Sequence, residues 1–348
     1  MKHYVRSLFV PFTAIILGLL IGAIIMWVSG YDAIAGYGKL WNGIFGSVRE
    51  MGEVVRKATP LILAGLAVAF AFKTGLFNIG VEGQVLMGFV ASVWIGTAFD
   101  LPMIIHLPLA IVVAMIAGSL WAFLPGLLKA WRGVHEVVVT IMMNYIALIV
   151  SGFLVREVLT DMQARTPNVH ESASLKSQFL KDLTSNSSMH WGIILSLIAV
   201  IVVWYLIERT TKGYELRAVG MNKYASQYAG INVNRNIIYS MMISGALAGL
   251  AGAMEGLGGY GYMSIPAGFT GVGFNGIAVA LLGAGNPLGI LFSAFLFAGL
   301  QVGGSNYFFT LEAPSEIIDV VIATIIFFVA IKYIIEYVLA RYTQKGEK

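Results

Sequence analysis

The sequence of 348 residues contains no cysteine and has few charged residues. Without cysteine the chain has no disulfide, no thiolate nucleophile and no cysteine-ligated metal site. Charged residues make up 11% of the chain, whereas a soluble domain has about 25%. Hydrophobic residues make up 58%, and the mean hydropathy is +0.82. These values exclude an ordinary soluble globular protein and predict an all-α integral membrane protein.

The chain also lacks the motifs of nucleotide binding and metal-dependent hydrolysis. It has neither a GxxxxGK[ST] phosphate loop nor an HExxH pair, and no nucleophile stands beside a base. The run GLGGYG at 256–261 follows no strand, so it is not a dinucleotide fingerprint. We therefore expect no catalytic residue, metal or cofactor, and ATP would have to bind another chain. The net charge of +4 is explained by basic cytoplasmic loops and does not indicate nucleic acid binding.

About ten apolar segments are present, including several too short or too broken to be simple spans. The first, from Leu8 to Val28, is not followed by a small-residue cleavage site, so we expect an uncleaved span. With the N-terminus inside, an even number of crossings returns the C-terminus inside, in agreement with Lys345 and Lys348. The segments lie near 9–29, 59–73, 84–99, 103–124, 134–155, 190–207, 237–257, 272–284, 287–303 and 315–335.

A polar segment at 208–236 separates two long apolar runs. It has five basic residues against Glu208 and Glu215, so the positive-inside rule places it in the cytoplasm. Its composition predicts two short helices, at 214–219 and 222–229, which Gly220 separates. Asn222 is the expected N-cap of the second helix, and Gly230 follows its end. Tyr224, Ala225 and Tyr228 would share one apolar face of that helix, suited to a groove on a partner.

Two other polar regions are expected outside the cell. The segment 156–189 is the one long external loop, and we expect it to cover the external mouth. Lys39, Arg49, Arg56 and Lys57 precede the second apolar segment and also fall outside, and their surroundings resemble an amphipathic helix on the membrane surface.

Two hydrophobic stretches are interrupted by glycine and polar residues, at 72–84 (FKTGLFNIGVEGQ) and at 283–287 (GAGNP). Irregular backbone at membrane depth must be buried in protein or line a cavity, because lipid cannot bond its amides and carbonyls. Paired interruptions of this kind indicate a transport pathway. The glycines at 245, 249, 252 and 256 have the spacing that brings helices close together.

Several polar residues within these segments have a functional and a structural interpretation. Glu82 and Glu255 are costly at membrane depth, yet Glu82 could cap the start of its own helix and Glu255 could face water at the outer mouth. Thr140 and Asn144, one turn apart, either line a path or bind neighbouring helices. We interpret Glu136, Glu316 and Asp319, together with His135, as residues that stabilise the N-termini of their helices.

Four stretches resemble the permease subunits of ATP-binding-cassette importers, in the branched-chain amino acid, sugar and nucleoside permease family. They are FNIGVEGQ at 77–84, HEVVVTIMMNYIA at 135–147, TTKGYELRAVGMNKYASQYAGI at 210–231 and GFTGVGFNGIAVALLGAGNPLG at 268–289. The resemblance implies a type II-like permease of a prokaryotic cell membrane. The third stretch resembles the coupling segment that docks on an ATPase subunit. The other three are most similar to members that import nucleosides such as guanosine.

The resemblance also implies partners and site residues. The expected partners are an ATP-binding subunit, an extracytoplasmic substrate-binding lipoprotein, membrane lipid and a second permease, either different from this chain or a copy of it. The residues expected to couple to the ATPase are Gly213, Tyr214, Leu216, Arg217, Val219, Gly220, Asn222, Tyr224, Ala225, Tyr228 and Gly230. Those expected along a translocation path are Asn78, Glu82, Gln84, Thr140, Asn144, Glu255 and Asn275.

Other functions remain open at this point. An importer of this class could carry sugars or branched-chain amino acids instead of nucleosides. An ion-coupled secondary carrier would use Glu82 and Glu255 as ion sites and would need no ATPase. A membrane enzyme would need clustered catalytic groups, which the sequence does not have.

Overall fold

The computed structural model describes residues 2–160 and 163–311, together with 320, 323–324 and 327–328. In this part of the chain, seven helices are long and apolar enough to cross a membrane. They are α3 (Val48–Lys73), α4 (Val81–Ala98), α5 (Met103–Arg132), α6 (Glu136–Phe153), α8 (Gly192–Arg209), α11 (Val233–Ala253) and α13 (Pro287–Leu311). π-Helical turns extend α6 through Leu154–Leu159 and α11 through Met254–Tyr260.

The remaining expected segments are matched in part. α1 (Lys2–Val28) matches the first, and the short apolar helix α12 (Val272–Leu282) matches the eighth. The tenth, near 315–335, falls mostly outside the described residues, as do Glu316 and Asp319.

The helix α3 forms the centre of the bundle. It packs against α8, α11, α12 and α13, and its side chains from Leu61 to Ala71 are almost completely buried. By contrast α5, α6 and α8 carry exposed apolar side chains such as Ile104, Ile149 and Ile201. Such surfaces are suited to contact with lipid chains, because the hydrocarbon core of a bilayer is apolar and contains no water.

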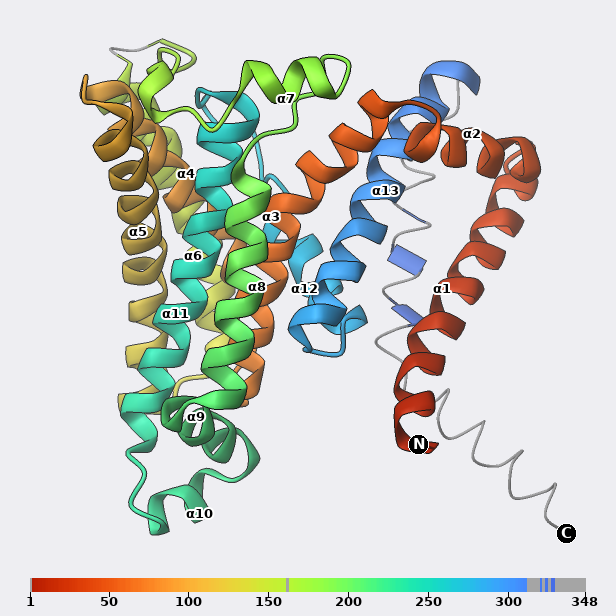
Figure 1. The fold of residues 1–348 in the computed structure, drawn as a ribbon. Helices are drawn as coiled ribbons and strands as arrows, with labels where there is room; N and C mark the ends of the chain where they lie inside the picture. The colour runs from red at the N-terminus through yellow and green to blue at the C-terminus, as the bar shows by residue number, and fades with distance from the viewer. Residues whose placement is uncertain (1, 161–162, 312–319, 321–322, 325–326, 329–348) are drawn as a thin grey trace, which may run out of the picture.

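The start of α3 differs from the sequence-based expectation. Asp32 caps a separate helix, α2 (Ala33–Phe45), which lies across one end of the bundle beside α1 and α13 (Figure 1). Ser47 then caps α3, where its hydroxyl accepts the amide of Glu50 at 3.2 Å. Arg49, Arg56 and Lys57 therefore belong to the first turns of α3 and not to a surface helix. Lys39, the fourth residue of that group, lies in α2.

Glycines bring α4, α5 and α11 into backbone contact. A Cβ on Gly249 would overlap the carbonyl oxygen of Ala114 on α5, and a Cβ on Gly88 of α4 would overlap Gly249 itself. Gly118 and Gly245 form a second such contact between α5 and α11. The small-residue spacing in α11 therefore does bring helices close together, as the sequence indicates.

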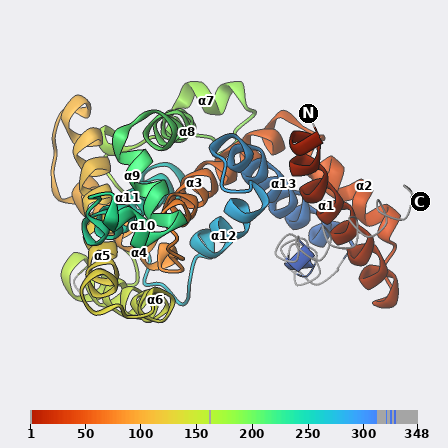
Figure 2. The same cartoon turned by 90° about the horizontal axis from the view of Figure 1, so that it is seen from below.

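The two polar regions lie at opposite ends of the bundle. Figure 1 shows α7 (Gln178–Leu183), within the segment 156–189, at one end, and α9 (Thr211–Met221) and α10 (Lys223–Tyr228) at the other. Figure 2 views the molecule from the α9 and α10 end, so that these helices lie towards the viewer.

The segment 156–189 is fixed to the bundle by backbone hydrogen bonds. The amides of Thr166, Val169 and Leu175 donate to the carbonyls of Met263, Gly261 and Leu257 at 2.8, 2.8 and 3.0 Å. His106 of α5 adds a side-chain contact, with Nδ1 2.7 Å from the hydroxyl of Ser172. The segment is thus joined to the end of α11 along much of its length.

Candidate functional site

The segment 208–236, called here the coupling segment after the role that the sequence resemblance implies, comprises the end of α8, α9, α10 and the first turn of α11. Each helix begins at a capping side chain. Thr210 accepts the amide of Gly213 at 3.0 Å, and Asn222 accepts those of Tyr224 and Ala225 at 3.0 and 3.1 Å. Gly230 follows α10 with φ of +82°, a conformation that glycine adopts without strain. The predicted capping role of Asn222 and the terminating role of Gly230 are confirmed.

Gly220 does not separate the two helices, contrary to the prediction. It lies inside α9, which continues to Met221, and the break comes at Asn222. A Cβ on Gly220 would overlap the carbonyl oxygen of Lys73 and would lie 3.1 Å from the amide nitrogen of Gly75. Glycine is needed here because the backbone of α9 touches the backbone of the turn after α3, which leaves no room for a side chain. Gly220 is thus required by a tertiary contact and does not end the helix.

α9 is also attached to the end of α8. The guanidinium Nη1 of Arg217 lies 2.7 Å from the carboxylate of Glu208 and donates to the carbonyl of Ile207. A Cβ on Gly213 would overlap the carbonyls of Leu206 and Ile207. Leu216 and Val219 are buried on the same inner side. Four of the predicted coupling residues therefore face the membrane domain and hold α9 in place.

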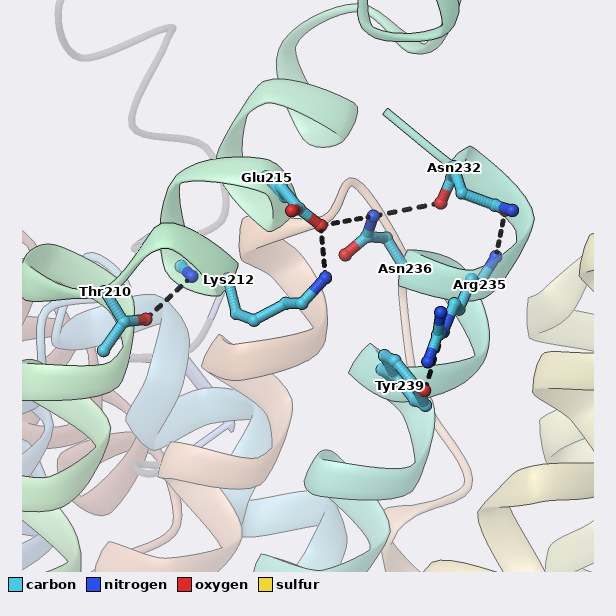
Figure 3. Close-up of polar contacts among 8 residues, drawn as sticks. Thr210, Lys212, Glu215, Asn232, Arg235, Asn236 and Tyr239 are labelled. Carbon is cyan, nitrogen blue, oxygen red and sulfur yellow. Dashed lines mark hydrogen bonds and ion pairs between the residues drawn. The ribbon is translucent and has the colours of Figure 1, made fainter. Parts of the chain in front are cut away.

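A third attachment joins α9 to α11 (Figure 3). The carboxylate of Glu215 lies 2.8 Å from Lys212 Nζ and accepts a hydrogen bond of 3.1 Å from Asn236 Nδ2. These two hydrogen bonds lower the pKa of Glu215, so the carboxylate is ionised at neutral pH. Asn232 caps α11 by accepting the amide of Arg235, and Arg235 Nε donates to the hydroxyl of Tyr239 at 2.7 Å. α9 is thus attached to α3, α8 and α11 at once.

The outer face of the coupling segment carries aromatic side chains that no described residue covers. The side chains of Tyr214, Tyr224 and Tyr228 are 64%, 71% and 99% exposed, and Ala225 is exposed beside them. A hollow of about 470 Å³ lies between α10 and the start of α11, lined by Lys223, Tyr224, Gln227 and 231–234. Aromatic side chains that point into solvent beside a hollow are typical of a protein interface.

A second polar site, called here the polar junction, lies where the chain breaks between α3 and α4. Asn78 Nδ2 donates to Gln84 Oε1 at 3.0 Å and to the hydroxyl of Ser244 at 2.9 Å. Ser244, on α11, donates in turn to the carbonyl of Ala67 on α3 at 2.6 Å. These groups are all buried, and they connect α3, α4 and α11.

The start of α4 is capped from α6 by Asn144. Its Oδ1 accepts the amide of Gly83 at 2.8 Å, and its Nδ2 donates to the carbonyl of Ile79 at 3.0 Å. Thr140, one turn earlier, lies 3.0 Å from the place that a Cβ on Gly80 would occupy. Asn144 therefore fixes the broken backbone at the start of α4, and Thr140 packs against it while its hydroxyl donates to the carbonyl of Val137.

Glu82 caps a distant helix, and not its own as expected. It is completely buried, and its carboxylate accepts the hydroxyl of Thr270 at 2.7 Å and the amides of Gly271 and Gly273 at 2.8 and 2.6 Å. Those groups form the start of α12, whose own N-cap residue, Gly271, has no side chain for the task. The charge is balanced by three donors and by the positive end of the α12 dipole.

The structure thus joins five of the seven predicted path residues through hydrogen bonds and packing. Asn275 stands beside them at the start of α12, where its Nδ2 lies 3.6 Å from the place that a Cβ on Gly271 would occupy. Glu255 lies at the opposite end of α11 and is only 5% exposed, so it does not face water as expected. Sequence reasoning missed Asn236, Ser244 and Thr270. Thr270 stands in a stretch already noted for its resemblance, whereas nothing in the sequence distinguishes Ser244.

These two sites offer hydrogen bonds and contact surface, and no reactive centre. No group of three or more His, Asp and Glu that could hold a metal ion occurs in the described residues. The polar junction joins four helices through buried amides and hydroxyls. The coupling segment presents a rigid, exposed aromatic face at one end of the same helices.

Comparison with known proteins places these features in a family. The model of the branched-chain amino acid transport system permease component matches residues 51–330. The guanosine permease NupP of Bacillus subtilis is 57% identical over 99% of each chain, and the nucleoside permease NupB of Lactococcus lactis is 42% identical over 98% of this chain and 95% of its own. The glucose permease TsgB13 of Haloferax volcanii is 30% identical over 91% and 86%. No solved structure matches the chain.

Proposed function

The chain belongs to the family of branched-chain amino acid transport system permease components, and we propose that it is the membrane-spanning subunit of an ATP-driven importer of nucleosides such as guanosine. One observation carries the proposal. The guanosine permease NupP matches the chain end to end at 57% identity, against 30% for the glucose permease. Sugars are therefore the second candidate cargo. The chain is a transport subunit and not an enzyme.

The coupling segment is the point where we propose that the ATPase subunit acts. Its five basic residues favour the cytoplasmic side. In the proposed topology α1 then begins inside, and the segment 156–189 lies outside (Figure 1). The exposed face of Tyr224, Ala225 and Tyr228 is the contact surface. α9 then transmits motion because it is fixed to α3, α8 and α11, and Gly220 bears on the turn that leads into the polar junction.

The polar junction is where this motion would change the transport path. Its groups Asn78, Gln84, Thr140 and Asn144 are neutral, and Glu82 is fully bonded. Neutral groups of this kind suit the passage of an uncharged cargo, because no fixed charge would have to be desolvated. Outside, a substrate-binding lipoprotein would deliver the nucleoside at the end that carries the segment 156–189. A second, related permease would complete the membrane-spanning part of the transporter. The complex would be a multi-pass assembly in the plasma or inner membrane of a prokaryotic cell.

The test is transport by the complete system. Cells that express all subunits and lack other nucleoside carriers are given labelled guanosine, ribose or leucine, before and after depletion of ATP and after collapse of the ion gradients. We expect guanosine uptake that depends on ATP and persists without an ion gradient, with the ATPase subunit co-purifying. Uptake of ribose or leucine instead of guanosine would refute the cargo, and uptake that follows an ion gradient would refute the energy source.

A further inference from the structure

The π-helical end of α11 carries a carboxylate that the proposed function has not used. In a π-helix each residue bonds the fifth residue along the chain, so Glu255 and Tyr260 lie one above the other. Glu255 is 5% exposed and Tyr260 is 51% exposed, so the ring lies at the surface and the carboxylate beneath it. This end of α11 is joined to the segment 156–189 and is therefore the outer end in the proposed topology. Single π-turns of this kind are frequent at functional sites.

Glu255 has no partner in the part of the chain that the structure describes. Its oxygens make no hydrogen bond there and lie in no ion pair, although Lys57 and Arg56 act on it electrostatically from α3. An ionic latch between helices would bring one of those cations within about 4 Å. The Glu255 oxygens are not among the fully enclosed polar atoms that lack a partner, so donors can reach them from outside the described chain.

Gly259 lies between Glu255 and Arg56. A Cβ on Gly259 would lie 3.3 Å from Glu255 Oε2 and 3.8 Å from Arg56 Nη1. Arg56 uses its Nε to bind Glu53 at 2.7 Å, and its Nη1 makes no hydrogen bond to any described residue. The site therefore presents an acceptor and a donor side by side, around a residue that has no side chain.

An aromatic surface borders this position. The ring of Tyr260 stacks on that of Phe89, with centroids 6.0 Å apart and planes 15° from parallel, and the ring of Tyr262 lies 6.4 Å from it. Aromatic side chains of this kind bind nucleobases by stacking, without regard to the identity of the base. The combination of a ring, a carboxylate and a guanidinium is suited to a base more than to a ribose.

We infer that Glu255, Arg56 and Tyr260 form an entry site that reads the base edge of guanosine. The carboxylate accepts the N1–H and N2–H₂ donors of guanine, Arg56 Nη1 donates to its O6, and Tyr260 stacks on the ring. This inference rests on the proposed function and deepens it, because it gives the permease itself a part in choosing the base. Adenine presents a donor where guanine has O6 and an acceptor where guanine has N1–H, so it matches neither group.

The test uses the complete transporter in proteoliposomes with its binding protein in excess. Initial uptake of guanosine and inosine is compared for the wild type, Glu255→Gln and Gly259→Ala. Inosine keeps O6 and N1–H but lacks the 2-amino group, so it makes one bond fewer to the carboxylate. Glu255→Gln should lower guanosine uptake about tenfold or more and inosine uptake less. Gly259→Ala should lower both, because its methyl group fills the position of the base edge.

The controls separate recognition from folding. Gly268→Ala places a methyl group in open space and should leave uptake as in the wild type. The amount of each variant in the membrane and its co-purification with the ATPase subunit should match the wild type. Guanosine uptake within twofold of the wild type in both variants, or equal losses for guanosine and inosine in Glu255→Gln, would overturn the inference. If the wild type imports no nucleoside at all, the proposed function fails instead.

Discussion

The Cα of Gly220 lies 3.4 Å from the position that a Cβ on Gly75 would occupy, so α9 and the turn after α3 meet backbone to backbone. No flexible side chain separates the two segments. A displacement of α9 is therefore passed directly to residues 74–80, which lead into Asn78 and the start of α4. Rigid contact of this kind is the physical requirement for a coupling element.

Replacing Gly220 with alanine tests this contact. The new methyl group would overlap the carbonyl oxygen of Lys73, and overpacking of this kind costs about 1–3 kcal/mol. We expect the protein to reach the membrane in normal amount while ATP-dependent uptake falls about tenfold. Gly38→Ala on α2, where a methyl group meets nothing within 4 Å, is the matched control. Wild-type uptake in Gly220→Ala would show that motion does not pass through this contact.

The exposed face of α10 leads to a prediction about binding. Tyr228 is 99% exposed, so Tyr228→Ala should leave the thermal stability of the isolated permease unchanged. If the ATPase subunit covers this face, its affinity should fall about tenfold, which is the usual effect of removing a central aromatic contact. Co-purification and titration with the ATPase subunit measure the change. Phe179→Ala, 64% exposed at the opposite end, should have no effect on the same measurement.

Glu82 allows a graded test of the polar junction. Glu82→Ala leaves three donors at the start of α12 without an acceptor, and we expect a loss of about 2–4 kcal/mol in stability. Glu82→Gln keeps one oxygen acceptor, so its loss should be smaller. The thermal unfolding temperature in detergent should be highest for the wild type, lower for Glu82→Gln and lowest for Glu82→Ala. Glu171→Ala, exposed in the outer segment, is the control. Equal stability of all these proteins would contradict the capping role.

Docking of the segment 156–189 should respond to acid through His190, which directly follows that segment. Burial, with help from the positive charges of Arg56 and Lys176, lowers the pKa of His190 to about 4. Above pH 6.5 the ring is neutral whether the segment is docked or open, so docking is unaffected. Between about pH 6.5 and 4 only the open form takes up the proton, so docking weakens as pH falls, by about 3 kcal/mol in total.

Hydrogen exchange of the amides of Leu175 and Trp191, which bond within this region, measures that opening. Their exchange should accelerate as pH falls from 6.5 towards 4, after correction for the intrinsic rate. His190 Nδ1 accepts the amide of Gly192 at 3.1 Å, and His190→Asn keeps an acceptor without a titrating ring. This variant should show no such pH dependence, and the same dependence in both proteins would exclude His190 as the cause.

Local features of the site were predictable from the sequence. Asn222 and Gly230 act within their own turn of helix, so the identity of each residue is enough to indicate its role. The interruption at 72–84 was visible because glycine and polar residues are rare in an apolar stretch. The glycine spacing in α11 likewise predicted close helix packing, since it depends only on which side chains are small.

Features that depend on distant partners were not predictable. Glu82 was expected to cap its own helix because its donors, Thr270 to Gly273, lie 188 to 191 residues away. The sequence predicts a helix break at Gly220, yet glycine is required there because a Cβ would overlap the carbonyl oxygen of Lys73. The start of α3 at Val48 was missed because charged residues in its first turns resemble a surface helix.

The distance between Glu82 and its donors has a consequence for synthesis. At about 5–20 residues per second, the 188 residues that separate Glu82 from Thr270 take roughly 10–40 s to emerge. During that interval α3 and α4 exist while the groups that bond the carboxylate do not. The turn between them must therefore stay near water or within the insertion machinery until α12 arrives. Residues 270–273, in the last quarter of the chain, thus complete a site that residues in its first quarter begin.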